Sequence, residues 1–227
     1  MQALSQKLGM DITDLNLINT MVEITKIENQ KNKNKFNLFV DGEFYSGILK
    51  ETAITNNFFV GKKLEKAELD KILIESETKQ AFEKASDYLG SRIHSKHELK
   101  LKLIKKGFSQ DAIFGAIKKL EEYGYISDKS FAQTYVNQNA KSSKKMLISK
   151  LLEKGVDKQT ILEVLEERTD EQELTNATVL LEKYFKNKNI QESKPKAFAY
   201  LLRKGFDYST AAKAMRKITN EDIFLED

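Results

Sequence analysis

The sequence predicts a mostly α-helical protein, an elongated tandem array of three three-helix repeats preceded by a small antiparallel β segment. The first observation is a recurring Lys-Gly-(Phe/Val) tripeptide, whose glycines Gly107, Gly155 and Gly205 are 48 and 50 residues apart. The second is apolar residues at helical spacing around each copy. The third is a change to alternating periodicity ahead of the first copy. Self-similarity at a fixed period is typical of repeat architectures.

Ahead of the array, alternation predicts strands within roughly 22–60. Phe36, Leu38 and Val40 alternate with other residues and lead into Asp41-Gly42, a dipeptide suited to the positive φ angles of a two-residue hairpin. A further strand is expected to begin at Val22, and the run 31–35 is expected to be a loop. Because a sheet of two or three strands is marginal alone, it must pack on the array or on a partner.

Each tripeptide predicts one helix that ends at the glycine and another that begins just after it. Glycine suits the left-handed residue at a helix end, and the preceding lysine suits the negative end of the helix dipole. Gly107, Gly155 and Gly205 are therefore interpreted as structural caps. The residues two positions after them can cap the next helix; these are Ser109, Asp157 and Asp207. The apolar pairs before them are expected on the buried stripe of the preceding helix; these are Leu103/Ile104, Leu151/Leu152 and Leu201/Leu202.

A third helix is predicted before each of these pairs, which gives nine helices in three repeats. The expected ranges are 64–90, 95–106 and 109–123, then 127–140, 143–154 and 157–168, then 171–187, 194–204 and 207–219. Pro195, the only proline, is expected near the start of the eighth helix, where its missing amide hydrogen is not needed.

These elements divide the chain into six segments. They are an N-terminal extension at 1–21, the β segment at 22–62, repeats at 63–123, 124–169 and 170–219, and an acidic tail at 220–227. The extension lacks clear periodicity, and Met21 stands directly before the first strand, so an upstream extension of the reading frame is one explanation. It does not resemble a signal peptide.

Composition excludes several classes of protein. There is no cysteine, hence no disulfide or thiolate chemistry, and no long apolar run, hence no expected membrane span. The expectation is a cytoplasmic monomer. No metal-ligand motif, nucleophile elbow or complete phosphate loop is present, so neither an enzyme nor a cofactor is expected; His94, His97 and Glu98 offer no fourth metal ligand.

The net charge of +4 is banded along the chain. Residues 92–150 hold 13 Lys/Arg against 5 Asp/Glu, 151–190 hold 6 against 9, and 191–218 hold 7 against 2. Bands of positive charge suit an extended polyanion or an acidic protein surface. The scarcity of arginine predicts phosphate contacts without base-specific readout. The competing interpretation is that these lysines only solvate helix faces.

The candidate contacts to such a polyanion or acidic protein surface all carry positive charge within the basic bands. They are Arg92, Lys96, Lys100, Lys141, Lys144, Lys145, Lys194, Lys196, Arg203, Lys213, Arg216 and Lys217.

From about residue 80 to 218 the chain resembles the RecX family, bacterial regulators of the recombinase RecA. The residues that carry the resemblance in repeat one and at the start of repeat two are Arg92, Ser95, Glu98, Leu99, Leu103, Lys106, Gly107 and Phe108, then Gly124, Tyr125, Ile126, Asp128, Phe131, Ala132, Tyr135 and Val136. The tripeptides at Gly155 and Gly205 resemble the family's later units. One departure is Ser143, near which the family often has glycine.

The resemblance implies a non-enzymatic protein that binds the RecA nucleoprotein filament, lies along its groove and restrains filament growth, ATP hydrolysis and strand exchange. Single- or double-stranded DNA would be touched through non-specific phosphate contacts. The alternative hypothesis is a stand-alone DNA-binding protein of helix-turn-helix type, with Arg203, Lys213, Arg216 and Lys217 near the DNA. A third is a helical scaffold for unrelated proteins.

Overall fold

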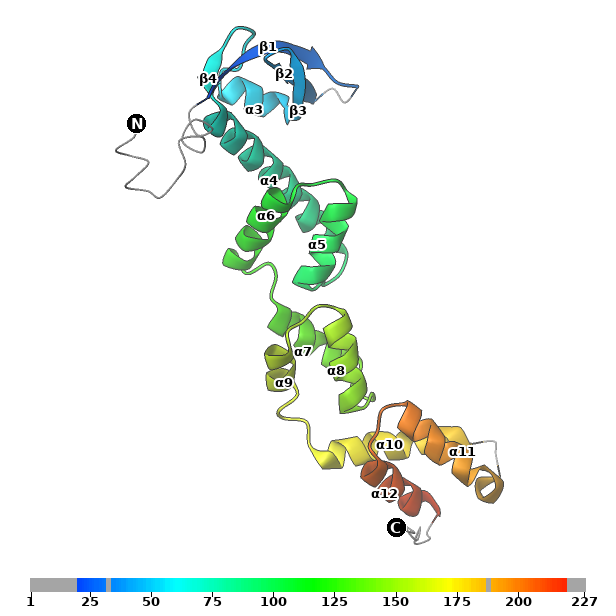
Figure 1. Ribbon diagram of the computed structural model, residues 1–227. Helices are drawn as coiled ribbons and strands as arrows, with labels where there is room; N and C mark the ends of the chain where they lie inside the picture. Colours follow the sequence, from blue (N-terminus) through cyan, green and yellow to red (C-terminus); the bar gives the residue numbers. More distant parts are fainter. Residues whose placement is uncertain (1–19, 32–33, 187–188, 220–227) are drawn as a thin grey trace, which may run out of the picture. The chain divides into compact units, whose positions relative to one another are not determined.

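The computed structural model describes residues 20–31, 34–186 and 189–219 (Figure 1). The chain divides into two compact units. The first holds the described parts of Met1–Tyr88 together with Lys102–Glu122, and the second holds Leu89–Leu101 and the described parts of Tyr123–Asp227. Most of the expected N-terminal extension and all of the acidic tail lie outside the described residues.

The first unit begins with a four-stranded sheet, which confirms the expected antiparallel β segment. The strands are β1 (Met21–Asn29), β2 (Lys35–Val40), β3 (Glu43–Leu49) and β4 (Lys63–Glu65), in the order β3-β2-β1-β4 with antiparallel pairing throughout. Asp41 and Gly42 join β2 to β3 with φ of 49° and 89°. These positive values are the ones that the hairpin prediction requires.

Two elements of this region were not predicted. They are β4 and the short helix α3 (Lys50–Thr55). Three residues of strand and six of helix are too few to show a period, which explains both omissions. Ile24, Leu38 and Ile48 of the sheet are buried together with Leu69 of the long helix α4 (Lys66–Ser91), so a helix supplies the cover that so small a sheet needs.

Helices follow in the order that the periodicity predicts. They are α4 (Lys66–Ser91), α5 (Lys96–Lys105), α6 (Gln110–Glu122), α7 (Asp128–Gln138), α8 (Lys144–Glu153), α9 (Lys158–Val164), α10 (Asp170–Phe185), α11 (Ile190–Arg203) and α12 (Tyr208–Thr219). In the first unit α6 approaches α4 closely at Gly115, where an added Cβ would lie 2.9 Å from Thr78 Cγ2. The second unit has one buried cluster on α7–α9 and another on α10–α12.

The expected burial of both residues in each apolar pair is wrong. Leu103, Leu151 and Leu201 are fully buried, whereas the following residues are exposed; these are Ile104 (54%), Leu152 (47%) and Leu202 (40%). Adjacent residues on a helix point about 100° apart because one turn takes 3.6 residues. The buried stripe of each helix is therefore only wide enough for the first member of the pair.

The expected position of Pro195 is also wrong. Helix α11 begins at Ile190, so Pro195 lies inside it rather than in its first turn. Proline has no amide hydrogen to donate to the carbonyl four residues earlier, which weakens α11 at this point.

Two joints of the same construction lie within the second unit and link α8 and α11 with the N-terminal part of α5, which belongs to this unit. At the first joint the N-terminus of α5 meets the C-terminal end of α8, and Ser95 Oγ donates to the Lys154 carbonyl (2.6 Å). At the second joint the N-terminus of α8 meets the C-terminal end of α11, and Ser143 Oγ donates to the Lys204 carbonyl (2.7 Å). Each hydroxyl also accepts a first-turn amide of its own helix, from Glu98 (3.1 Å) and Met146 (3.2 Å) respectively. Each serine therefore caps one helix and ties it to another.

A carboxylate completes each joint. The Lys96 amide donates to Asp128 Oδ1 (2.9 Å), and the Lys144 amide donates to Glu173 Oε2 (3.0 Å). The positive end of one helix dipole then faces the negative end of the next, with an acid beside the positive end. Fully buried Ser95 and Ser143 have their hydroxyls satisfied on both sides.

The joints also require two of the three repeated glycines to lack a side chain. Gly107, Gly155 and Gly205 have φ of 87°, 75° and 86°, the left-handed conformation expected at a helix stop. A Cβ at Gly155 would lie 2.3 Å from His97 Cβ, and one at Gly205 would lie 2.7 Å from Ser143 Oγ. At Gly107 nothing lies within 4 Å of such a Cβ.

Comparing Gly155→Ala with Gly107→Ala separates backbone strain from crowding. Both variants place alanine at positive φ, which costs about 1–2 kcal/mol. Only Gly155→Ala also pushes a methyl group into His97, so its melting temperature, followed by circular dichroism, should fall further. Equal melting temperatures of the two variants would show that contact with His97 does not destabilise Gly155→Ala.

Comparing Ser143→Ala with Ser127→Ala isolates the second joint. Ser127 Oγ accepts from the Ser130 amide as the N-cap of α7, so its loss should cost roughly 1 kcal/mol. Ser143→Ala removes a cap and also a hydrogen bond to the Lys204 carbonyl, for a loss of about 2–3 kcal/mol. Urea unfolding of the two variants measures the difference, and equal losses would mean that the interhelical bond contributes nothing.

Candidate nucleic-acid and protein interface

Two of the predicted contact residues, Arg92 and Lys96, take part in ion pairs at the first joint. Arg92 Nη1 lies 3.1 Å from Glu98 Oε2, and Lys96 Nζ lies 3.7 Å from Asp128 Oδ2. Lys154 Nζ, from the end of α8, lies 2.9 Å from the other oxygen of Glu98. Glu98 therefore bridges two cations, and the positive charge of the first joint is largely neutralised internally.

The pKa of Glu98 reflects these contacts. Its partial burial alone would raise the pKa, because burial disfavours the charged carboxylate. Hydrogen bonds from Lys154 and Arg92, with their positive charges, outweigh the burial and hold the pKa below its usual value. The carboxylate is therefore charged at neutral pH.

The second joint has different charges at equivalent positions. With the 48-residue offset that superposes Ser95 on Ser143, Glu98 corresponds to Met146 and His97 to Lys145. Glu173, the joint's carboxylate, is already paired with Arg168, whose Nε lies 2.6 Å away, and both side chains are almost fully buried. Within the part of the chain that the structure describes, no carboxylate lies within ion-pair distance of the exposed lysines Lys141, Lys145 and Lys204.

These lysines lie around an open hollow in the second unit. The hollow has a volume of about 270 Å³ and is lined by Lys141, Ser142, Ser143, Met146, Leu180, Lys204 and Phe206. Lys145 is beside it, since its Cβ lies 3.6 Å from the position that a Cβ on Gly205 would take. The structure therefore brings together Lys141, Lys144 and Lys145, three predicted contact residues, with Lys204, which was interpreted only as part of a helix end.

The other predicted contacts are spread over three helices. Lys100 is exposed on α5, and Lys196 and Arg203 are exposed on α11, where Lys194 is half-buried. On α12, Lys213 and Lys217 are exposed one turn apart, and Arg216 is half-buried. Charge alone could not show which of the predicted contact residues lie close together in the structure. A position-by-position comparison of the repeats, with Met146 in place of Glu98, was the signal that could have found Lys204.

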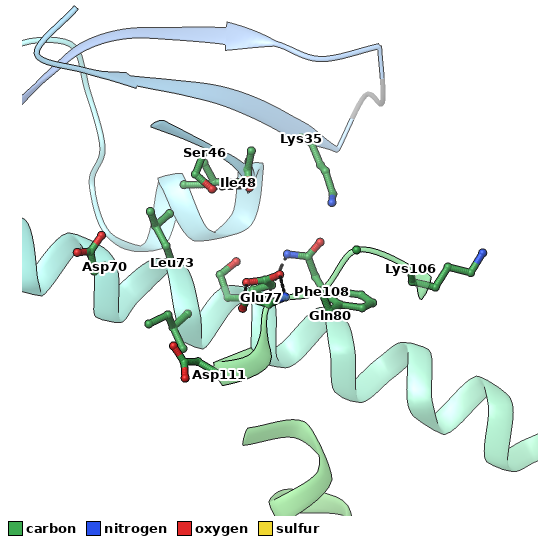
Figure 2. A pocket seen from close by; sticks show the side chains of 15 residues that line it. Lys35, Ser46, Ile48, Asp70, Leu73, Glu77, Gln80, Lys106, Phe108 and Asp111 are labelled. Carbon is green, nitrogen blue, oxygen red and sulfur yellow. Dashed lines mark hydrogen bonds between the residues drawn. The ribbon is translucent and has the colours of Figure 1, made fainter. Parts of the chain in front are cut away.

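The first unit contains a larger pocket, shown in Figure 2. It has a volume of about 490 Å³ and lies between β3, α4 and the turn before α6. Two of the acids that line it are used internally: Glu77 accepts from the amide (2.8 Å) and hydroxyl (2.5 Å) of Ser109, and Asp70 accepts from the Tyr45 hydroxyl (2.5 Å). These contacts fasten structural elements and offer no nucleophile with an adjacent base.

The histidines noted in the sequence do not meet. His94 is buried, with Nδ1 2.9 Å from the Arg92 carbonyl oxygen, whereas His97 is exposed beside Gly155. Among the described residues no group of three His, Cys, Asp or Glu side chains could hold a metal ion. Every helix there is also too short or too polar to cross a membrane.

Solved structures with the same fold carry RecX titles. A crystal structure of regulatory protein RecX superposes with a TM-score of 0.59 and 22% identity, covering 86% of this chain and 99% of the other. The crystal structure of RecX from Lactobacillus salivarius superposes with a TM-score of 0.57 and 23% identity, covering 64% of this chain and 98% of the other.

Sequence comparison identifies relatives more directly. Regulatory protein RecX of Listeria welshimeri is 32% identical over 169 residues, which are 73% of this chain and 63% of that protein. The Bacillus subtilis protein of the same name is 32% identical over 167 residues, 72% and 63% of the two chains. This chain therefore spans less than two thirds of the length of these curated relatives.

Family models match three separate parts of the chain. The N-terminal domain of regulatory protein RecX matches residues 22–65, the first RecX three-helix domain matches 81–120, and the third matches 170–215. The order of the three matches is also that of the sheet and the helices that the structure shows. This chain belongs to the RecX family of regulatory proteins.

Proposed function

We propose that the protein is a non-enzymatic cytoplasmic regulator that binds the RecA nucleoprotein filament and restrains its growth, ATP hydrolysis and strand exchange. It would thereby act in recombination and DNA repair. The observation that carries the proposal is family membership, with domain models matched in both halves of the chain and relatives named as regulatory proteins.

The joints support binding to a repeating partner. They connect α5, α8 and α11 through the same serine, glycine and carboxylate contacts, so helices of like orientation recur along the second unit. A filament presents identical protomers at a fixed interval. A chain with repeated helices can contact more than one of them, and linked contacts bind more tightly than any single contact.

The charges support contact with the DNA that the filament holds. Most of the exposed cations are lysines, which bind phosphate as point charges and do not form the bidentate contact to guanine that arginine makes. Contacts of this kind position a protein on nucleic acid without reading its sequence.

RecA-catalysed ATP hydrolysis on single-stranded DNA is the direct test. The protein should inhibit hydrolysis at amounts well below one molecule per RecA, because one regulator that blocks growth affects many protomers. Heat-denatured protein at the same concentration is the control. Unchanged hydrolysis at equimolar protein would reject the proposal, and sequence-preferring DNA binding in that case would favour the helix-turn-helix alternative.

Reversing two lysines tests the charge contribution. Lys144→Glu with Lys145→Glu should weaken binding to preformed filaments on labelled DNA and reduce its dependence on salt. The fold should remain, because acids in the first turn of α8 suit the helix dipole and Lys144 contributes to the joint through its backbone amide.

The matched control carries the same change in charge within the acidic band. Lys158→Glu with Lys183→Glu alters two exposed lysines of α9 and α10. If both double variants bind filaments equally well at low and high salt, Lys144 and Lys145 only solvate their helix.

A further inference from the structure

The second joint has an excess of positive charge that the first joint lacks. The first combines Arg92, Lys96 and Lys154 with the acids Glu98 and Asp128. The second combines Lys141, Lys144, Lys145, Arg168 and Lys204 with the single acid Glu173. Two joints with the same hydrogen bonds therefore differ by three units of charge, an excess of one against an excess of four.

We infer that the open hollow at the second joint binds nucleic-acid phosphates through Lys141, Lys145 and Lys204, and that the first joint does not. This inference rests on the DNA contact within the proposed function, but it concerns binding by this chain alone. It assigns that contact to one place in the molecule.

One position accounts for much of the contrast. Glu98 holds the lysine that ends α8 at 2.9 Å, so Lys154 already has a carboxylate partner. The equivalent residue at the second joint is Met146, which lines the hollow with Lys204 and cannot neutralise it. Lys204 instead lies with its ammonium 5.6 Å from the centre of the Tyr200 ring, a contact that leaves the cation exposed.

The ligand groups are the lysine side chains and not the helix terminus. Two first-turn amides of α8 already have acceptors, since the Met146 amide donates to Ser143 Oγ and the Lys144 amide donates to Glu173. Glu173 is held by the nearly buried Arg168, whose Nη2 donates to the carbonyls of Ala140 (3.1 Å) and Ser142. Its ion-pair partner is therefore Arg168, and among the described residues no ion pair joins it to Lys141, Lys145 or Lys204.

A phosphodiester backbone fits this arrangement better than a protein surface does. The lining residues include no arginine and no exposed aromatic ring, two of the kinds of side chain that are enriched where proteins meet. Several lysines around one open hollow can meet successive phosphates of one strand, which in B-DNA rise by about 3.4 Å each along the helix axis. Binding would be independent of sequence and strongly dependent on salt.

Exchanging the residues that distinguish the joints tests the inference. The full chain is titrated into a fluorescein-labelled oligothymidylate without RecA, and anisotropy is followed at several salt concentrations. Met146→Glu should give Lys204 the carboxylate that Lys154 has, so affinity should fall several-fold. The slope of log K against log salt is negative, and its magnitude should decrease by about 0.7 for each phosphate that the variant no longer neutralises. Glu98→Met, which frees Arg92 and Lys154, should instead strengthen binding.

Two further variants control for general charge and for folding. Gln159→Glu adds the same negative charge at an exposed position of α9 and should change the affinity little. Lys141→Gln with Lys204→Gln removes two of the cations without adding a charge near Ser143, and should reproduce the weaker binding expected of Met146→Glu. Circular dichroism melts show that each variant is folded.

The outcomes separate this inference from the proposed function. Unchanged affinity and slope in Met146→Glu and in the double glutamine variant overturn it. It is also overturned if these variants keep oligonucleotide binding but no longer bind RecA filaments, since the hollow would then contact protein. If oligonucleotide binding falls as expected while the unaltered chain has no effect on RecA, the inference stands and the proposed regulator does not.

Discussion

The hydrogen bond from a capping serine to the last carbonyl of another helix is the interaction on which the second unit depends. A helix end leaves amides or carbonyls without partners, and burying them unsatisfied is costly. Ser95 and Ser143 resolve both kinds of end at once, since each hydroxyl accepts from its own helix and donates to the next. The close approach that this bond needs is possible only because Gly155 and Gly205 carry no side chain.

The two joints therefore share the residues that make these hydrogen bonds, whereas the charges of the surrounding side chains can differ. The serine and the lysine-glycine end must be present in both, but the residue three positions after the serine can be Glu98 or Met146 without altering these bonds. The same geometry consequently accommodates a neutralised joint and a strongly basic one. Family membership alone gives no indication of this difference.

Much of the fold could be predicted because it depends on local signals. The glycine stops, the capping residues and the helical period located the helices, and Asp41-Gly42 located the hairpin. Elements too short to show a period, β4 and α3, could not be found in this way. Burial of Ile104, Leu152 and Leu202 was overestimated because period alone does not give the width of a buried stripe.

The candidate site was less predictable because it depends on contacts between distant residues. Charge identified Arg92 and Lys96 as readily as Lys141 and Lys145, but only the structure shows that the first two have acids beside them. Lys204 was not predicted as a contact because its place at a helix end, before Gly205, already accounted for a lysine there. Lys96 and Asp128 are 32 residues apart and Lys154 and Glu98 are 56 apart, so these ion pairs leave no periodic trace in a single sequence.

The shared construction of the joints makes their two halves interchangeable. The serine at the start of α5 and the serine at the start of α8 each meet a lysine-glycine end of another helix. Ser95 could therefore donate to the Lys204 carbonyl beside Gly205 as it donates to the Lys154 carbonyl beside Gly155. A gene could thus lose or duplicate one block of about 48–50 residues and still encode matching ends at every junction. The length of such a chain can change in whole repeats without any new interface having to evolve.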